Sequence, residues 1–108
     1  MAEPEPTPTF MDDVKIALRI SSSVYDAEIE MLIDAAIADL ALAGISEDKL
    51  PGPEEDPTDP LIKRAIATYC KAHFGYDNPE AERFEKAYKA IKLHLMLSSE
   101  YGGNSDAV

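Results

Sequence analysis

The sequence predicts an all-α fold, a small bundle of four helices in which the first helix is the shortest. In four segments apolar residues recur at helical spacing, and residues that cap or end helices bound each segment. No segment shows the strict alternation of apolar and polar residues that a half-buried strand requires. With 108 residues, 45% of them apolar, the chain is long enough for one domain with its own core.

The first helix is expected over about residues 10–19. Thr9 is its predicted N-cap, and Asp12 stands three residues later, where a capping-box acid belongs. The serines at 21–23 end the helix, because serine side chains compete for backbone hydrogen bonds. Residues 1–8 contain three prolines and two glutamates, a composition typical of a disordered leader.

A second helix is predicted from a cap at Ser23 or Asp26 to about Ala43, with Gly44 as its terminator. Because each helical residue turns by about 100°, its apolar residues gather in one broad stripe that is expected to face the core. The stripe consists of Ile29, Leu32, Ile33, Ala36, Ile37, Leu40 and Ala43.

The second helix also carries a smaller apolar stripe on roughly the opposite side. It consists of Met31, Ala35, Ala38 and Leu42, and acidic residues flank it. Alanines selected for helix propensity, together with two scattered apolar residues, would produce such a stripe without any function. The alternative is a second contact surface, inside the subunit or between subunits, and these four residues are then candidate interface residues.

A long loop over residues 45–59 separates the second helix from the third. It contains three prolines and six acidic residues, and a loop of this length in a compact domain is often functional or mobile. Asp59 and Pro60 then supply the N-cap and the first-turn proline of a third helix, which Gly75 closes. Its predicted apolar face consists of Leu61, Ile62, Ala65, Ile66, Tyr69, Ala72 and His73.

A basic strip of Lys63, Arg64 and Lys71 lies on the other side of the third helix. The first 59 residues of the chain, by contrast, carry 15 acidic residues and only three basic ones. Solvated charges on loops and helix ends would explain this division. The alternative is a charge-polarised subunit, in which the basic strip of one copy meets the acidic flank of the second helix in the next copy. The three basic residues are therefore also candidate interface residues.

The fourth helix is predicted from Asn78 and Pro79 to about Leu97. Beyond Ile91 its apolar residues point nearly all round, so this end is expected to be covered on several sides. Residues 99–108 are expected to form a flexible tail, which leaves 9–98 as the single helical domain. The predicted buried stripe of this helix is Ala81, Phe84, Ala87, Tyr88, Ile91 and Leu95.

Composition excludes several classes of function. A net charge of −11 argues against a protein that grips the nucleic-acid backbone or an anionic membrane, and no apolar run approaches about 18 residues. His73 and His94 have no Asp, Glu or Cys at the spacing of metal ligands. Cys70 and His73, at i and i+3, could touch on a helix, but a thiol nucleophile also needs an electropositive surrounding and an orienting third group, which the sequence does not indicate. The sequence therefore predicts no enzyme, no cofactor and no metal, and it favours binding or assembly.

The order of the elements resembles that of the head–tail connector, or adaptor, proteins of tailed bacteriophages, which are also labelled DNA-packaging proteins. The resemblance rests on VKIALRI at 14–20, on YDAEIEMLIDAAIADLALAGI at 25–45, and on the helices at 59–95. It spans roughly residues 10–97. These motifs are helix-packing patterns and include no catalytic residue.

The resemblance implies an all-α virion protein of the head–tail junction, assembled in the host cytoplasm. Its copies would form a ring of about a dozen subunits below the portal protein. A tail-side connector or stopper protein would bind beneath the ring, and DNA would pass through the ring without specific binding. A competing hypothesis explains the net charge equally well. It is an acidic DNA mimic or regulatory protein that inhibits a DNA-binding partner.

Overall fold

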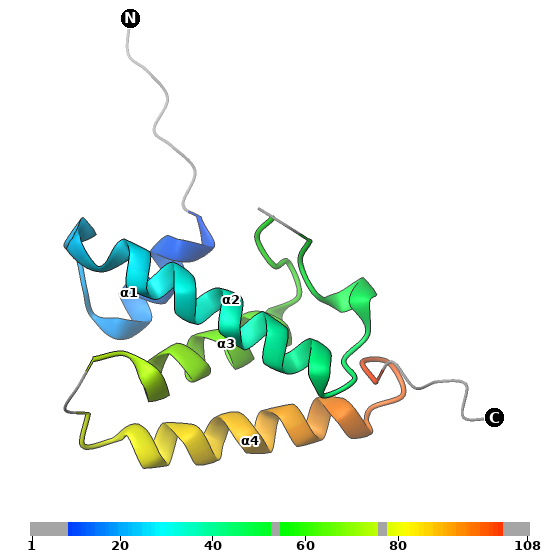
Figure 1. The fold of residues 1–108 in the computed structure, drawn as a ribbon. Helices are drawn as coiled ribbons and strands as arrows, with labels where there is room; N and C mark the ends of the chain where they lie inside the picture. The colour runs from blue at the N-terminus through cyan, green and yellow to red at the C-terminus, as the bar shows by residue number, and fades with distance from the viewer. Residues whose placement is uncertain (1–8, 53–54, 76–77, 103–108) are drawn as a thin grey trace, which may run out of the picture.

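The structure, a computed structural model, describes residues 9–52, 55–75 and 78–102 (Figure 1). This part of the chain is all-α and contains no strand, as the sequence predicts. The bounds of the elements are α1 (Phe10–Leu18), η1 (Ser23–Tyr25), α2 (Asp26–Leu42), η2 (Glu47–Lys49), α3 (Pro60–His73) and α4 (Ala81–Leu97), where η denotes a 3₁₀ turn.

Helix α1 begins with the predicted capping box. The Thr9 hydroxyl accepts a hydrogen bond from the Asp12 backbone N–H, and the Asp12 carboxylate accepts one from the Thr9 N–H. Phe10 and Val14 are buried, so this short helix gains its stability from packing. Arg19 ends the helix in the left-handed conformation, with φ +63°.

Helix α2 starts differently from the prediction. Ser22 caps the 3₁₀ turn η1 by accepting from the Val24 N–H, and α2 continues from that turn without a side-chain cap. The predicted caps at Ser23 and Asp26 are therefore wrong, since the extra turn satisfies the first N–H groups. The core stripe is confirmed, with Ile29, Ala36 and Leu40 completely buried, and the terminating Gly44 has φ +98°.

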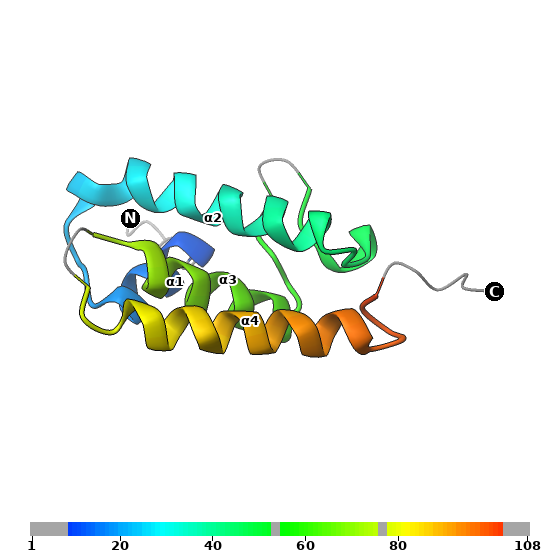
Figure 2. The ribbon, with the colours of Figure 1, turned by 60° about the horizontal axis from the view of Figure 1, so that its bottom comes forward.

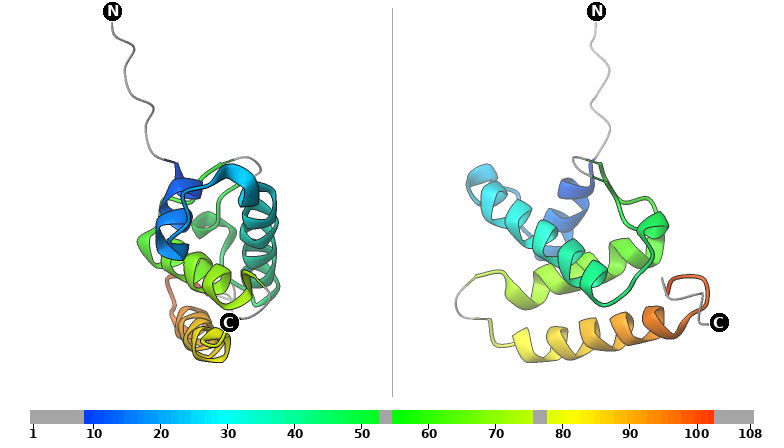
Figure 3. Two further views of the ribbon diagram at one scale, coloured as in Figure 1. Left: turned by 90° about the vertical axis from the view of Figure 1, so that its left-hand side faces the viewer. Right: turned by 45° about the vertical axis from the view of Figure 1, so that its right-hand side comes forward.

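Helix α3 lies between α2 and α4 and packs against α1 as well (Figures 2 and 3). Its N-cap is Asp59, whose carboxylate accepts from the N–H groups of Leu61 and Ile62 at 2.9 and 3.2 Å. The residues of this helix that are buried in the core are Ile62, Ala65, Ile66, Cys70 and Ala72. Two members of the predicted apolar face, Leu61 and His73, are exposed instead.

Helix α4 begins at Ala81, two residues later than the Asn78-Pro79 pair predicted. Asn78 accepts a hydrogen bond from the Glu80 N–H and forms a turn that precedes the helix. Only Tyr88 and Leu95 of α4 are buried, and Ala87 of the predicted stripe is exposed. Helix α4 lies at the edge of the bundle, which explains this limited burial (Figure 2).

The expectation that the end of α4 would be covered on several sides is wrong for the isolated subunit. Leu93 and Leu97 are 54% and 78% exposed. Within the described residues, the segment after α4 covers only part of this end, and no further helix packs there.

The chain after α4 folds back onto the domain as far as Gly102, which forms an isolated bridge with Ile45. Tyr101 is buried in the core, and its carbonyl accepts a hydrogen bond from the Ser46 N–H at 2.7 Å. The tail predicted from residue 99 therefore cannot include 99–102, because an aromatic side chain anchors them. The remaining positions, 103–108, and the predicted leader at 1–8 lie outside the described residues.

The described parts of the loop after α2 contact the rest of the domain. Ile45 and Pro57 are buried, Leu50 packs against the core, and η2 forms a short turn between them. The Asp56 carboxylate also accepts a hydrogen bond from the Phe10 N–H at 3.1 Å. The described part of this loop is thus joined to the start of α1.

Candidate assembly surfaces

The smaller apolar stripe of α2 lies on the outside of the subunit. Met31 and Leu42 are 70% and 88% exposed, and Ala35 and Ala38 are exposed between them. Within the described residues, the stripe is therefore not part of the core of the domain. Large apolar side chains exposed along one helix face are a feature of protein interaction sites.

The acids of α2 are divided between internal bonds and the surface. Asp26 pairs with Lys15 at 2.8 Å, and Glu28 accepts from the Gly75 N–H at 3.4 Å. Within the described residues, Glu30 and Asp34 have no ion-pair partner. Both carboxylates are exposed.

Asp39, one of the acids flanking the stripe, is bound within the subunit. It accepts hydrogen bonds from the Tyr88 hydroxyl at 2.5 Å and from Lys92 Nζ at 2.9 Å, and so joins α2 to α4. Burial raises the pKa of the Asp39 carboxyl, but the bonds from Tyr88 and Lys92 outweigh it, so the pKa lies below its usual value. Asp39 is therefore a structural residue of the fold.

The predicted basic strip of α3 is exposed to different degrees along its length. Arg64 is exposed, while Lys63 and Lys71 are half-buried. The Lys71 ammonium lies 5.2 Å from the centre of the Phe84 ring, a cation–π contact that joins α3 to α4. The strip and the α2 stripe belong to different helices, α3 and α2, which pack against each other.

Lys71 also belongs to a groove of about 730 Å³, which we call the basic groove. It lies where the end of α1, the end of α3 and the start of α4 converge. Its lining includes Leu18, Arg19, Lys71, Phe74, Arg83 and Phe84. The sequence does not predict that Arg19 and Arg83 belong to one surface, because no local pattern signals that the ends of three helices bring these side chains together.

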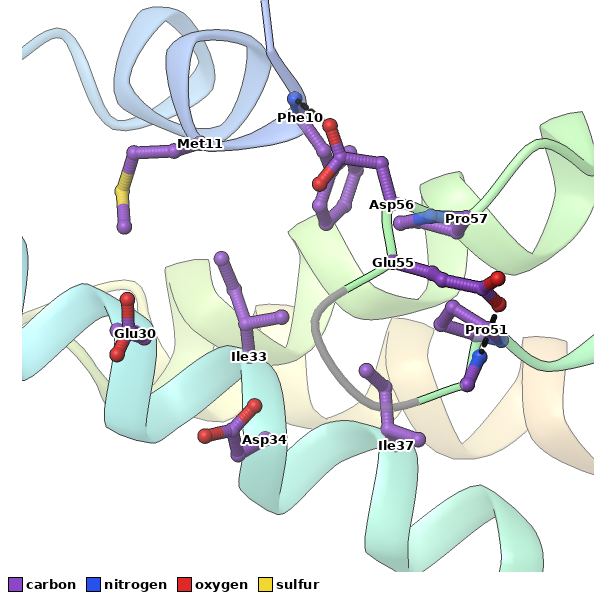
Figure 4. A pocket seen from close by; sticks show the side chains of 11 residues that line it. Phe10, Met11, Glu30, Ile33, Asp34, Ile37, Pro51, Glu55, Asp56 and Pro57 are labelled. Carbon is purple, nitrogen blue, oxygen red and sulfur yellow. Dashed lines mark hydrogen bonds between the residues drawn. The ribbon is translucent and has the colours of Figure 1, made fainter.

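A second groove, of about 830 Å³, is acidic and lies between α1, α2 and the loop before α3 (Figure 4). Glu55 accepts a hydrogen bond from the Gly52 N–H at 2.9 Å and shapes its edge. The apolar part of the lining includes Met11, Ile33 and Ile37, while the acids are Glu30, Asp34, Glu55 and Asp56. The subunit thus presents an acidic groove and a basic groove at separate places.

Cys70, His73 and His94 are the residues whose side chains could take part in catalysis, and the structure places them apart from any such arrangement among the described residues. Cys70 is completely buried, and burial raises the pKa of its thiol to about 12, which removes the thiolate needed for nucleophilic attack. His73 stacks on Tyr69 with ring centres 4.3 Å apart, and His94 is exposed. Among the residues described, no three His, Cys, Asp or Glu side chains gather as metal ligands. In the same part of the chain, no helix has the length and apolarity to cross a membrane.

The described part of the chain is thus a small all-α domain with an exposed apolar stripe, an acidic groove and a basic groove. A comparison with protein-family models matches residues 10–102 to the family described as phage connector protein. The chain therefore belongs to the phage connector protein family. Searches of the curated proteins and of the solved structures find no match.

Proposed function

We propose that this chain is the subunit of a head–tail connector ring in a tailed phage. About a dozen copies would assemble below the portal protein, surround the path of the DNA and provide a platform for a tail-side connector or stopper. The role is structural rather than catalytic, and the protein's place is the head–tail junction of the virion.

The observation that carries this proposal is the exposed apolar stripe of α2 in a chain of the phage connector family. Exposed apolar surface of this kind costs free energy in water and is best retained where another molecule covers it. A second copy of this chain is the partner that requires the fewest assumptions, because the same chain also presents the basic strip of Lys63, Arg64 and Lys71. Met31, Ala35, Ala38 and Leu42 would form one side of the contact between copies.

Closed rings need two different surfaces on each subunit, so that every copy binds the next in the same direction. The α2 stripe and the basic side of α3 would meet this requirement, since they are unlike in charge and lie on different helices. The net charge of −11 suits a ring around DNA as well, because an acidic wall does not hold the phosphate backbone.

The test is the mass of the protein in solution, measured by light scattering over a range of concentrations, with and without the portal protein. The proposal predicts a high oligomer that forms as concentration rises and that binds the portal. A monomer or dimer that ignores the portal and binds tightly to a basic DNA-binding protein would support the DNA-mimic hypothesis instead.

A further inference from the structure

We propose that the basic groove receives the outer face of α2 from a second copy of this chain. The inference rests on the proposed self-assembly and names the surfaces that meet. The sequence suggested a contact between the basic strip of one copy and the acidic flank of α2 in the next. In the contact proposed here, α2 of one copy lies in the basic groove of the next, where apolar and ionic contacts act together.

The chemistry of the groove calls for an acidic and partly apolar occupant. The Phe84 ring carries two cations, with Lys71 Nζ 5.2 Å and Arg83 Cζ 5.0 Å from its centre. Arg19 adds a third positive charge to the lining. Glu80 also lines the groove and pairs with Arg83, so the described lining holds three cations and one acid and remains positive. Leu18 supplies apolar surface beside these charges.

The outer face of α2 has the complementary character. Met31 is a large flexible apolar side chain that can fill an irregular space, and Ala35 and Ala38 let the helix backbone come close. Glu30 and Asp34 lie between this stripe and the acidic groove, which they also line, and both are exposed and available to pair with the arginines and the lysine of the basic groove. Helix spacing keeps the acids and the stripe on adjoining faces.

The two surfaces cannot meet within one subunit. In the left panel of Figure 3, α2 lies along one side of the domain, while α1 lies on the opposite side. The groove opens between α1 and the ends of α3 and α4. Each copy therefore presents the helix to one neighbour and the groove to another, which is the head-to-tail arrangement that a ring requires.

Arg19 gives an independent reason to assign a use to the groove. It ends α1 with φ +63°, a conformation for which helix ends favour glycine. An arginine here opposes the backbone preference, and such local conflicts are expected where a side chain serves a function. Contact with the acids of a neighbouring α2 would provide that function.

The test uses two charge-reversed variants. The groove variant carries Lys71→Glu with Arg83→Glu, and the helix variant carries Glu30→Lys with Asp34→Lys. Each alone should raise the concentration needed for assembly at least about tenfold, because like charges then face one another. Mixed in equal amounts they should assemble again, since every contact in an alternating oligomer then joins opposite charges.

The matched control is Lys86→Glu with Lys89→Glu, which reverses two exposed lysines of α4 outside the groove and should leave assembly unchanged. Circular dichroism checks that all variants remain helical. A groove variant that assembles like the wild type overturns the inference and leaves the proposed function standing. Loss in both variants without recovery on mixing also overturns it, because the two surfaces then do not meet. A wild-type chain that stays monomeric at all concentrations, with and without portal protein, overturns the proposed function.

A third variant tests the groove without introducing a repulsive charge. Arg19→Gly removes one cation and suits the left-handed backbone, so the thermal midpoint of the subunit should be unchanged or higher. Assembly should weaken roughly threefold to tenfold, as expected for the loss of one or more exposed ion pairs. If the Arg19→Gly variant is stable and assembles at the same concentration as the wild type, Arg19 does not take part in the contact.

Discussion

The Tyr101 hydroxyl donates a hydrogen bond of 2.8 Å to the carboxylate of Asp59, a residue 42 positions earlier in the chain. Asp59 is also the N-cap of α3, so one carboxylate joins the end of the domain to the start of its central helix. Burial of Asp59 opposes ionisation, but the bonds from Tyr101 and from the α3 backbone outweigh it, and the pKa of this carboxyl lies below its usual value.

Replacing Tyr101 by Phe should lower the thermal midpoint by a few degrees, because the Asp59 carboxylate loses one of its donors. Tyr101→Ala should lower it considerably more, since it also removes a ring from the core. Calorimetry of both variants measures the difference. Equal midpoints for wild type and Tyr101→Ala would show that the segment after α4 contributes nothing to the fold.

Asp39→Asn should destabilise the subunit at pH 7 by about 1 kcal/mol, after allowance for the solvent that screens this partly exposed group. Because the folded pKa of Asp39 is lowered, its contribution is present above the pKa of the unfolded chain and is lost as pH falls through the folded value. The gap between variant and wild type should therefore narrow below about pH 4.

Urea unfolding at pH 7 and at pH 3 measures this gap. Asp48→Asn is the control, because Asp48 is exposed and makes no ion pair among the described residues. Its effect should stay within about 0.5 kcal/mol at both values. An Asp39→Asn variant that is equally destabilised at both pH values would mean that ionisation of Asp39 is not what stabilises the fold.

Cys70 should react with a thiol reagent only when the subunit unfolds. Its side chain is completely buried, and burial raises the pKa of its thiol to about 12, so the native state holds almost no thiolate at pH 8. A colorimetric thiol assay in increasing urea should give a labelling curve that follows the unfolding transition. Fast labelling of the native protein would contradict the packing of α3.

Ala38→Glu should weaken assembly by about tenfold or more and leave the helix content intact. The residue is exposed in the subunit, so glutamate costs little there, whereas an interface would bury the added charge. Circular dichroism and sedimentation velocity give the two readings. If Ala38→Glu sediments like the wild type at all concentrations, the α2 stripe is not a contact between copies.

Local signals predicted the fold well. The Thr9 capping box, the Asp59-Pro60 start of α3 and the terminating Gly44 depend on residues close in sequence, and all three are present in the structure. Burial at the end of α4 could not be predicted, since the sequence does not show whether Leu97 is covered within its own subunit or left exposed.

The candidate surfaces were predictable only in part. Helix spacing placed the α2 stripe correctly on one face, because that depends on a single helix. Helix spacing also grouped Asp39 with the surface acids, although its carboxylate accepts a hydrogen bond from the Tyr88 hydroxyl within the domain. The basic groove depends on the approach of three helix ends, a tertiary arrangement with no counterpart in any local motif.

The most direct test of the whole account is electron microscopy of single assembled particles of the wild-type protein. The proposed function predicts closed rings of one size, with a central opening wide enough for duplex DNA and about a dozen copies around it. Discrete monomers, compact dimers or open filaments at the highest concentrations tested, both without and with the portal protein, would contradict the claim that this chain is the subunit of a connector ring.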